Sequence, residues 1–268
     1  MIGIRTRSYE PRRPRRRGWA FLAFFLTASL AVAGCSAKKP PPEVDSGPDP
    51  VETHFLAAES HSYAGRHHEA IAEYRKVLQL QPDLVEAWYN VGNEFYRTRD
   101  YDRAAKAFEN AIKTDPTHRK SYNNLGIVLT EIGQPNKAIK VLTRVTAIDP
   151  GYVKAWISLG LAYYAVEQYP KAAMTFKEAL RINPESADAY TNLGNTYTVQ
   201  QLYPEAVEAY RKALLLNGDD ANTHYNLGTT YARMGRTNDA AIQLETLEML
   251  DPVKADSLRR RIRLGPPL

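Results

Sequence analysis

The chain of 268 residues has little of three features on which other protein classes depend. It has one cysteine, Cys35, which excludes a disulfide framework and a metal site built from cysteines. Its glycines recur at wide intervals rather than in a cluster, which excludes a glycine-rich phosphate-binding loop. Its one pronounced uncharged, apolar run, residues 19–34, has 16 residues, fewer than the roughly 20 that a transmembrane helix needs.

Arrangements of catalytic and metal-binding residues are also missing. The sequence suggests no Ser-His-Asp or Cys-His constellation, so no nucleophilic catalysis is expected. Four of the six histidines crowd one stretch: His54, His61, His67 and His68. His54 and His61 lie two turns apart on one expected helix with no obvious carboxylate partner, which favours surface or packing histidines over a metal site. We therefore expect no enzyme, no cofactor and no metal.

What the sequence does contain is a period of 34 residues that runs from Val51 to about Lys254. Five glycines mark it, with Ala58 in the same place one period earlier: Gly92, Gly126, Gly160, Gly194 and Gly228. Twelve residues after each comes an alanine: Ala70, Ala104, Ala138, Ala172, Ala206 and Ala240. A turn residue precedes the end of each period: Pro82, Pro116, Pro150, Pro184, Gly218 and Pro252. A fixed period of this length indicates a stacked helical array, an architecture suited to binding.

Each period contains two amphipathic helices. The first carries large residues and a glycine at i, i+3, i+4 and i+7, as in Trp156, Leu159, Gly160 and Tyr163. The second repeats the stripe with Ala172, Phe176, Ala179 and Leu180. Small residues at Gly160 and Ala172 let the two helices approach closely. Pro170 and Pro204 fall in the first turn of a second helix, where a missing N–H costs nothing. The pattern predicts twelve helices in six antiparallel pairs.

Four segments carry a family resemblance. Tyr-Asn-Val-Gly-Asn-Glu-Phe-Tyr (89–96) and Tyr-Asn-Leu-Gly-Thr-Thr-Tyr-Ala (225–232) resemble the first-helix signature of the tetratricopeptide repeat (TPR) family, and residues 101–105 and 203–206 resemble the opening of its second helix. The resemblance implies an all-α, right-handed superhelix of six units: 51–84, 85–118, 119–152, 153–186, 187–220 and 221–254. Residues 255–268 would form a capping helix and tail, with Arg259–Arg261 and Arg263 either solvated or in contact with lipid phosphates or an acidic partner.

The N-terminal residues indicate export. Residues 1–18 carry seven arginines and one glutamate, and the apolar run that follows ends Leu30-Ala31-Val32-Ala33-Gly34-Cys35. This ending resembles the bacterial lipobox. The resemblance implies that residues 1–34 are a lipoprotein signal peptide and that Cys35 receives a thioether-linked diacylglycerol. An ordinary signal peptide that ends at a chance cysteine is the alternative. The arginine pairs at 12–13 and 16–17 raise the twin-arginine export route.

Removal of residues 1–34 would change the charge balance. The whole chain carries +5, and these residues carry +6, which leaves −1 for the rest. The basic pI is therefore no evidence for nucleic-acid binding. Residues 35–50 are rich in proline and predict a semi-extended tether. Ser36 is not the aspartate that typically holds Gram-negative lipoproteins in the inner membrane, so the resemblance implies the outer membrane, facing the periplasm.

The family resemblance also implies that the first helices line a concave groove. Four asparagines would follow one inner wall, where they hold the backbone of an extended peptide or bond to neighbouring helices: Asn90, Asn124, Asn192 and Asn226. An apolar and aromatic surface would anchor side chains or fill inter-repeat packing: Tyr89, Tyr96, Ile127, Ile157, Leu161 and Tyr164. Asn93, Asn124 and Lys154 occupy three of the five positions of the family's carboxylate clamp. Tyr89 and Ser158 replace two of its cations, which speaks against terminal-carboxylate recognition.

These features predict a membrane-anchored TPR lipoprotein that acts as a protein-interaction scaffold. Its partner would be another protein or an extended peptide, with the membrane reached through the lipid anchor, and neither nucleic acid nor a small-molecule substrate is expected. An envelope assembly factor is the first alternative, either a type IV pilus secretin pilotin or an outer-membrane or cell-wall assembly adaptor. A self-assembling structural array is an alternative of a different class.

Overall fold

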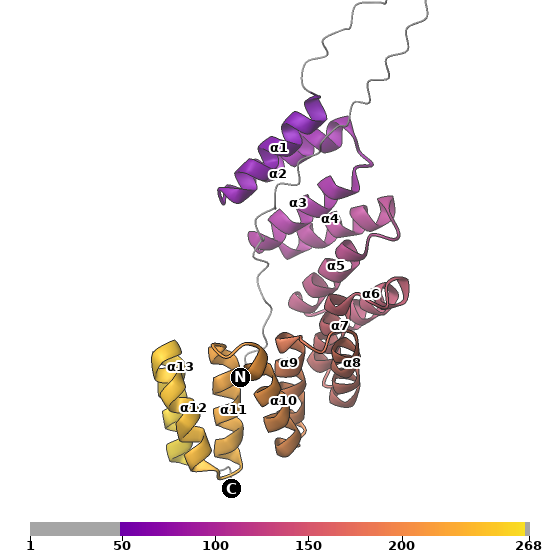
Figure 1. The fold of residues 1–268 in the computed structure, drawn as a ribbon. Helices are drawn as coiled ribbons and strands as arrows, with labels where there is room; N and C mark the ends of the chain where they lie inside the picture. The colour runs from indigo at the N-terminus through magenta and orange to yellow at the C-terminus, as the bar shows by residue number, and fades with distance from the viewer. Residues whose placement is uncertain (1–48, 266–268) are drawn as a thin grey trace, which may run out of the picture. The chain divides into compact units, whose positions relative to one another are not determined.

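The computed structural model describes residues 49–265, which form thirteen α-helices and no β-strand (Figure 1). The first helices of the six pairs are α1 (Pro50–Tyr63), α3 (Val85–Arg97), α5 (Arg119–Glu131), α7 (Val153–Ala165), α9 (Ala187–Val199) and α11 (Ala221–Arg233). The second helices are α2 (His67–Leu80), α4 (Tyr101–Thr114), α6 (Pro135–Ile148), α8 (Tyr169–Ile182), α10 (Tyr203–Leu216) and α12 (Thr237–Leu250). α13 (Pro252–Leu264) follows them. The expected signal peptide, Cys35 and the tether up to residue 48 lie outside the described residues.

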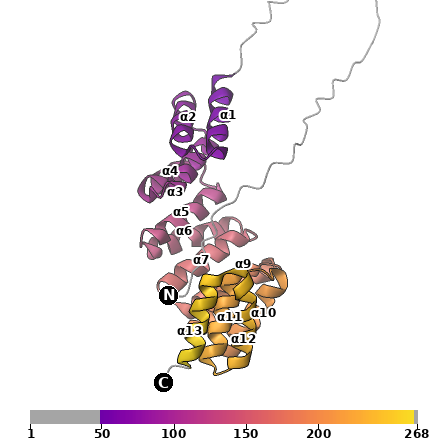
Figure 2. The ribbon, with the colours of Figure 1, turned by 90° about the vertical axis from the view of Figure 1, so that its left-hand side faces the viewer.

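The helices pack in chain order. Each first helix contacts the second helix of its own pair, and each second helix contacts the first helix of the next pair (Figures 1 and 2). From α3 to α11, first helices of consecutive pairs also contact one another. The all-α array of helix pairs that the sequence predicted is thereby confirmed. No helix within residues 49–265 combines the length and the apolar character needed to span a membrane.

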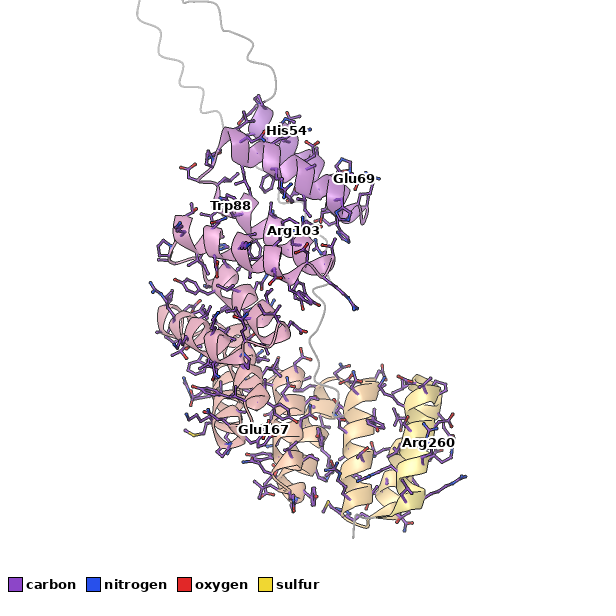
Figure 3. The ribbon with its side chains drawn as sticks, turned by 180° about the vertical axis from the view of Figure 1, so that it is seen from behind. His54, Glu69, Trp88, Arg103, Glu167 and Arg260 are labelled. Carbon is purple, nitrogen blue, oxygen red and sulfur yellow. The ribbon has the colours of Figure 1, made fainter. Side chains whose placement is uncertain are left out.

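The turn inside each pair repeats one backbone conformation. Its middle residue has a positive φ in all six pairs: Gly65 (71°), Arg99 (61°), Gly133 (75°), Glu167 (60°), Gln201 (61°) and Gly235 (73°). Glycine adopts this left-handed conformation freely, whereas other residues are strained in it. Three repeats therefore hold a strained residue, such as Glu167, at this turn (Figure 3).

The periodic glycines of the first helices admit large side chains from the second helices. A Cβ atom added to Gly160 would lie 2.5 Å from Cε1 of Phe176, which is fully buried. The same relation holds for three further pairs: Gly92 with Phe108, Gly126 with Leu142, and Gly194 with Tyr210. The close approach of the two helices that the sequence predicted at Gly160 is thus a contact between the Gly160 backbone and the Phe176 ring. Ala172, the other small residue predicted there, is fully buried.

The sixth pair completes this packing with α13. A Cβ atom on Gly228 would lie 2.5 Å from Cδ2 of Leu258 in α13, so a residue from beyond the repeat fills the space. Leu258, Leu247 and Ala255 are all buried there, and α13 contacts both α11 and α12 (Figure 2). Its first residue is Pro252 rather than residue 255, because the Asp251 carboxylate already caps the helix by accepting from the Lys254 N–H at 3.1 Å.

Candidate peptide-binding surface

The six apolar and aromatic residues predicted as anchors are all half-buried on the first helices. Tyr89 and Tyr96 lie on α3, Ile127 on α5, and Ile157, Leu161 and Tyr164 on α7. We call these six residues the anchor row. Its side chains are partly packed and partly open to solvent. That they anchor a bound partner stays a prediction.

Ring contacts orient two of the tyrosines. The Tyr164 ring meets that of Tyr169, the first residue of α8, edge to face at 5.3 Å between centroids. Tyr96 and Tyr101, at the same positions two repeats earlier, are 5.6 Å apart. Burial raises the pKa of Tyr96 and of Tyr164 above the usual phenol value. Both hydroxyls therefore stay protonated at neutral pH and can donate hydrogen bonds.

Polar side chains link the first helices of consecutive repeats. Between α3 and α5, the Asn124 amide donates to Asn93 Oδ1 at 2.9 Å. Between α5 and α7, the Ser158 hydroxyl donates to Asn123 Oδ1 at 2.9 Å. Between α9 and α11, the Asn226 amide donates to Asn195 Oδ1 at 2.8 Å. We call these inter-repeat hydrogen bonds the polar spine.

Between α9 and α11 the polar spine is extensive. The Thr191 and Thr223 hydroxyls are 2.8 Å apart, and those of Thr198 and Thr230 are 3.2 Å apart. The Tyr210 hydroxyl also donates to Asn195 Oδ1 at 2.8 Å. All of these residues are buried, so the bonds satisfy polar groups that would otherwise be costly inside the array.

The four predicted asparagines accordingly have different surroundings. Asn90 and Asn124 are half-buried, whereas Asn192 and Asn226 expose only 4% and 7% of their surface. Asn226 uses its amide in the polar spine, as the alternative of bonding to a neighbouring helix requires. Asn192 lies close to Leu161, Tyr164, Phe176 and Asn195, with no space for a water molecule between them. Binding of a peptide backbone by any of the four stays a prediction.

The residues at the positions of the carboxylate clamp differ in their contacts and in their exposure to solvent. Asn93 and Asn124 are hydrogen-bonded to each other, and Lys154 is exposed at the start of α7. Ser158, which stands where the clamp has a cation, is buried and bonded to Asn123. Lys154 is therefore the one cation among these groups.

Two residues of α11 were not identified from the sequence as site residues. Thr229 Oγ1 and Arg233 Nε are buried atoms with no hydrogen-bond partner among the described residues. They lie one helical turn apart on α11, at positions 9 and 13 of their repeat, which the family resemblance directs into the groove. An unsatisfied buried donor is costly, and because these two atoms are closed to solvent, only the remaining atoms of the half-buried Thr229 and Arg233 side chains are open to a bound partner. The repeat position was the sequence signal that could have identified them.

Two of the four histidines, His54 and His67, have carboxylate partners, which corrects the sequence interpretation for His54. His54 Nδ1 lies 2.6 Å from Glu73 Oε2, and His67 Nδ1 lies 2.7 Å from Glu94 Oε2. Glu94 is buried and also accepts from the Ser62 hydroxyl at 2.8 Å. These contacts tie α1 and α2 to each other and to α3. Residues 49–265 contain no group of three or more His, Cys, Asp or Glu side chains placed to hold a metal ion.

Comparison with known proteins matches this architecture. The family model described as TPR repeat matches residues 63–98, 162–201 and 194–235, and the one described as Tetratricopeptide repeat matches residues 92–153. Together they cover well over half of the chain. Among proteins of curated function, none matches the sequence.

Several solved structures share the fold. YrrB, described as a TPR protein with an unusual peptide-binding site, is 25% identical over 63% of this chain and 88% of its own, with a TM-score of 0.53. MamA from Desulfovibrio magneticus RS-1 is 25% identical over 65% and 98%, with a TM-score of 0.59. Pseudomonas aeruginosa pilF, at 17% identity over 79% and 97% and a TM-score of 0.66, is similar in fold alone.

Proteins built from these repeats are generally non-catalytic scaffolds for protein or peptide interaction. The repeat period, the glycine packing and the family matches at residues 63–98, 92–153 and 162–235 all agree. The chain belongs to the tetratricopeptide repeat family.

Proposed function

We propose that this protein is a membrane-anchored scaffold that holds an extended peptide segment or a partner protein against its first helices. The observation that carries the proposal is the anchor row, six half-buried apolar and aromatic side chains on three consecutive first helices. Exposed apolar surface of this kind, with tyrosines in it, is typical of binding sites.

Polar groups beside the anchor row would hold the backbone of the partner. The half-buried carboxamides of Asn90 and Asn124 would do so, and Asn124 would exchange its hydrogen bond to Asn93 for one to the partner. The half-buried side chains of Thr229 and Arg233 lie further toward the C-terminal end, on α11. YrrB, which shares 25% sequence identity with this chain, has a peptide-binding site, and this likeness supports a peptide as the class of ligand.

The membrane anchor is the second part of the proposal. Cys35 would carry the lipid after cleavage of residues 1–34, and the proline-rich residues that follow would separate the helical array from the membrane. With serine at position 36, we place the protein at the outer membrane, facing the periplasm. Replacement of Cys35 by Ser tests this. Metabolic labelling with an alkyne fatty acid and membrane fractionation should both lose their signal, and a variant that is still labelled would refute lipidation at Cys35.

The binding surface is tested by crosslinking and affinity capture from native membranes. Leu161→Glu places a charge in the anchor row, where a bound apolar side chain would lose its contact. Leu215→Glu is the matched control, because Leu215 is 86% exposed on the second helix α10. A partner should be captured by the wild type and by the control but not by the Leu161→Glu variant.

The opposite result is equally informative. If the same partners are captured with both variants, while circular dichroism shows both to be folded, the anchor row is not the binding surface.

A further inference from the structure

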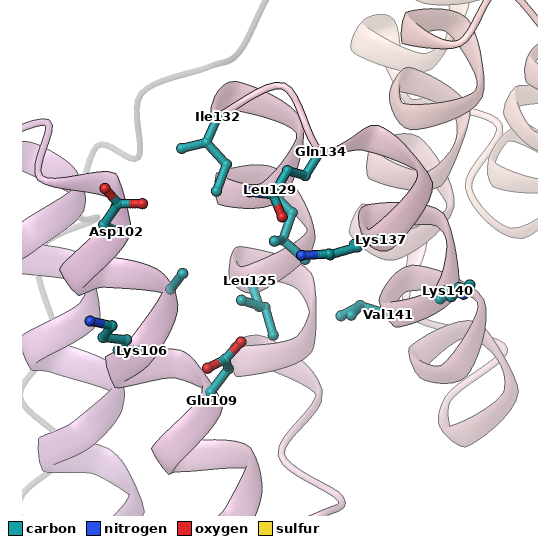
Figure 4. Close-up of a pocket in the computed structure, with 11 residues that line it drawn as sticks. Asp102, Lys106, Glu109, Leu125, Leu129, Ile132, Gln134, Lys137, Lys140 and Val141 are labelled. Carbon is teal, nitrogen blue, oxygen red and sulfur yellow. The ribbon is translucent and has the colours of Figure 1, made fainter.

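A cavity of about 540 Å³ lies away from the anchor row, between α4, α5 and α6 (Figure 4). Its apolar walls include Ala105, Leu125, Leu129, Ile132 and Val141. Charged side chains surround them: Asp102, Lys106 and Glu109 from α4, and Lys137 and Lys140 from α6. Two second helices and one first helix build this site, and it shares no residue with the anchor row.

The cavity lies at the interface where the repeat departs from its own pattern at two positions, 105 and 129. In the other inter-repeat interfaces from α2 to α11, an aromatic ring stands where Leu129 stands here: Phe95, Tyr163, Tyr197 and Tyr231. The facing position on the preceding second helix is Ile71, Ile139, Ala173 or Val207 in those interfaces, and here it is Ala105. Only at this interface are both positions free of a ring or a β-branched side chain. Less side-chain volume therefore fills this interface than fills the others.

The cation that accompanies the ring is nevertheless present. Arg103 lies over the Phe95 ring at 4.8 Å, and Lys171 lies over the Tyr163 ring at 5.6 Å. Tyr197 and Tyr231 are covered by cations from other repeat positions, Lys177 at 5.7 Å and Arg236 at 4.7 Å. Lys137 has the same repeat position as Arg103 and Lys171, and Figure 4 shows its side chain reaching toward Leu129.

The cavity lining holds three amines, Lys106, Lys137 and Lys140, against two carboxylates, Asp102 and Glu109. None of the ion pairs between residues of the described range involves Lys106, Lys137 or Lys140. An apolar hollow beside unpaired ammonium groups is complementary to a π-face and to an adjacent carboxylate.

We propose that this cavity binds an aromatic side chain of a partner protein, followed or preceded by an acidic residue. The ring would lie on Leu129 beneath the Lys137 ammonium, as the Tyr163 ring lies beneath Lys171. The neighbouring carboxylate would pair with Lys140. The partner thus supplies the side chain that the repeat pattern lacks. This second binding site does not depend on the anchor row of the proposed function.

The probe is a fluorescein-labelled peptide with one tryptophan between two aspartates, compared with the same peptide carrying alanine in place of tryptophan. Fluorescence anisotropy with the full chain should show the tryptophan peptide binding at least ten-fold more tightly. Leu129→Tyr fills the cavity with the residue that the other repeats use, and it should weaken binding at least ten-fold. Ala105→Ile should do the same by a different route, so the test does not depend on one variant folding.

The role of the cation is tested separately. Lys137→Gln should lower the affinity for the tryptophan peptide by about two- to five-fold, the range of an exposed cation–π contact. Lys137→Arg, which keeps the cation, should bind the peptide as the wild type does. Lys113→Gln, an exposed lysine of α4 that does not line the cavity, is the matched control and should have no effect.

Two results would overturn the proposal. One is equal binding of the tryptophan and alanine peptides to the wild type. The other is unchanged binding of the tryptophan peptide to both cavity-filling variants. If Leu161→Glu alone abolishes binding, the peptide occupies the anchor row and the cavity is not its site.

Discussion

At the scale of single residues, the middle residue of the turn inside each helix pair has the same conformation in chemically different repeats. Gly65, Gly133 and Gly235 adopt it without steric strain, whereas Arg99, Glu167 and Gln201 place a Cβ atom in the left-handed region. The conformation is thus dictated by the helix pair and imposed on whatever residue occupies the turn.

Glu167→Gly should therefore stabilise the protein. Relief of left-handed strain is worth roughly 1–2 kcal/mol, and the greater freedom of glycine in the unfolded chain offsets roughly 0.5–1 kcal/mol of it. We expect the free energy of unfolding to rise by about 0.5–1 kcal/mol in urea titrations. Gly133→Ala is the converse change and should lower it by a similar amount. A loss of stability in Glu167→Gly would contradict the argument.

His118 makes a different residue-scale contribution, one that depends on pH. Its ring meets that of Tyr89 edge to face at 5.3 Å, and its Nδ1 lies 2.7 Å from the Ser121 hydroxyl. Burial lowers the pKa of His118, although the charges of Glu86 and Asp115 oppose the shift. The folded state therefore binds this proton less readily than the unfolded state.

It follows that His118 stabilises the fold most above the unfolded histidine pKa of roughly 6.5 and loses that contribution as the pH falls. In His118→Asn, which cannot titrate, this part of the pH dependence should vanish. Urea midpoints measured from mildly alkaline to mildly acidic pH should show the wild type losing its advantage over the variant on acidification. Parallel pH profiles for the two proteins would contradict the prediction.

At the scale of the helix, the packing of glycine against a ring sets the spacing within a pair. The space that Gly160 leaves is filled by Phe176, which is completely buried and has no room to withdraw. Alanine at this position would force the ring or the helix to move.

Gly160→Ala should destabilise the protein by roughly 1–3 kcal/mol, the range for overpacked cores, despite the better helix propensity of alanine. The Gly160→Ala change should cost less in a Phe176→Ala background, where the ring is gone, and a double-mutant cycle by urea denaturation measures this coupling. Purely additive effects would mean that the two side chains do not limit the helix distance. In the first repeat, Ala58 and Tyr74 have the repeat positions of Gly160 and Phe176, and both are buried. That repeat therefore accommodates the methyl group that Gly160→Ala would introduce.

The sequence predicted the helices well because their signals are local. The stripe of apolar residues, the prolines at 135, 170 and 204 in first turns, and the closing turns all act within one helix. The start of α13 was misplaced by three residues, because the cap at Asp251 overlaps the end of the sixth repeat and the 34-residue period hides it.

The site was harder to predict because it depends on which neighbour each side chain meets. Asn124 and Asn226 have the same repeat position, yet one is half-buried and the other is buried. The residues that decide this difference come from neighbouring helices. Asn226 donates to Asn195, and Tyr210, which is hydrogen-bonded to Thr198, donates to the same Asn195 oxygen. The cavity at Leu129 was visible in the sequence only as a departure from the period.

At the scale of the whole described array, α13 supplies the contact that the sixth repeat cannot make for itself. Leu258→Ala should open a cavity against Gly228 and cost roughly 2–5 kcal/mol of the stability of the C-terminal repeats. Hydrogen exchange should accelerate in α11 and α12 but not in α3 to α6, because each repeat contacts only its neighbours. Leu264→Ala, an exposed change on the same helix, is the control.

In an array of units that share one sequence pattern, the shared residues do not determine at which repeat a ligand binds. A ligand that recognises only what the units share could settle at any of several equivalent offsets, each one period from the next, and the complex would be a mixture. The interface that holds Ala105 and Leu129 in place of larger side chains breaks this translational symmetry at one point. A partner whose side chain enters the proposed site there would bind the whole array in a single register.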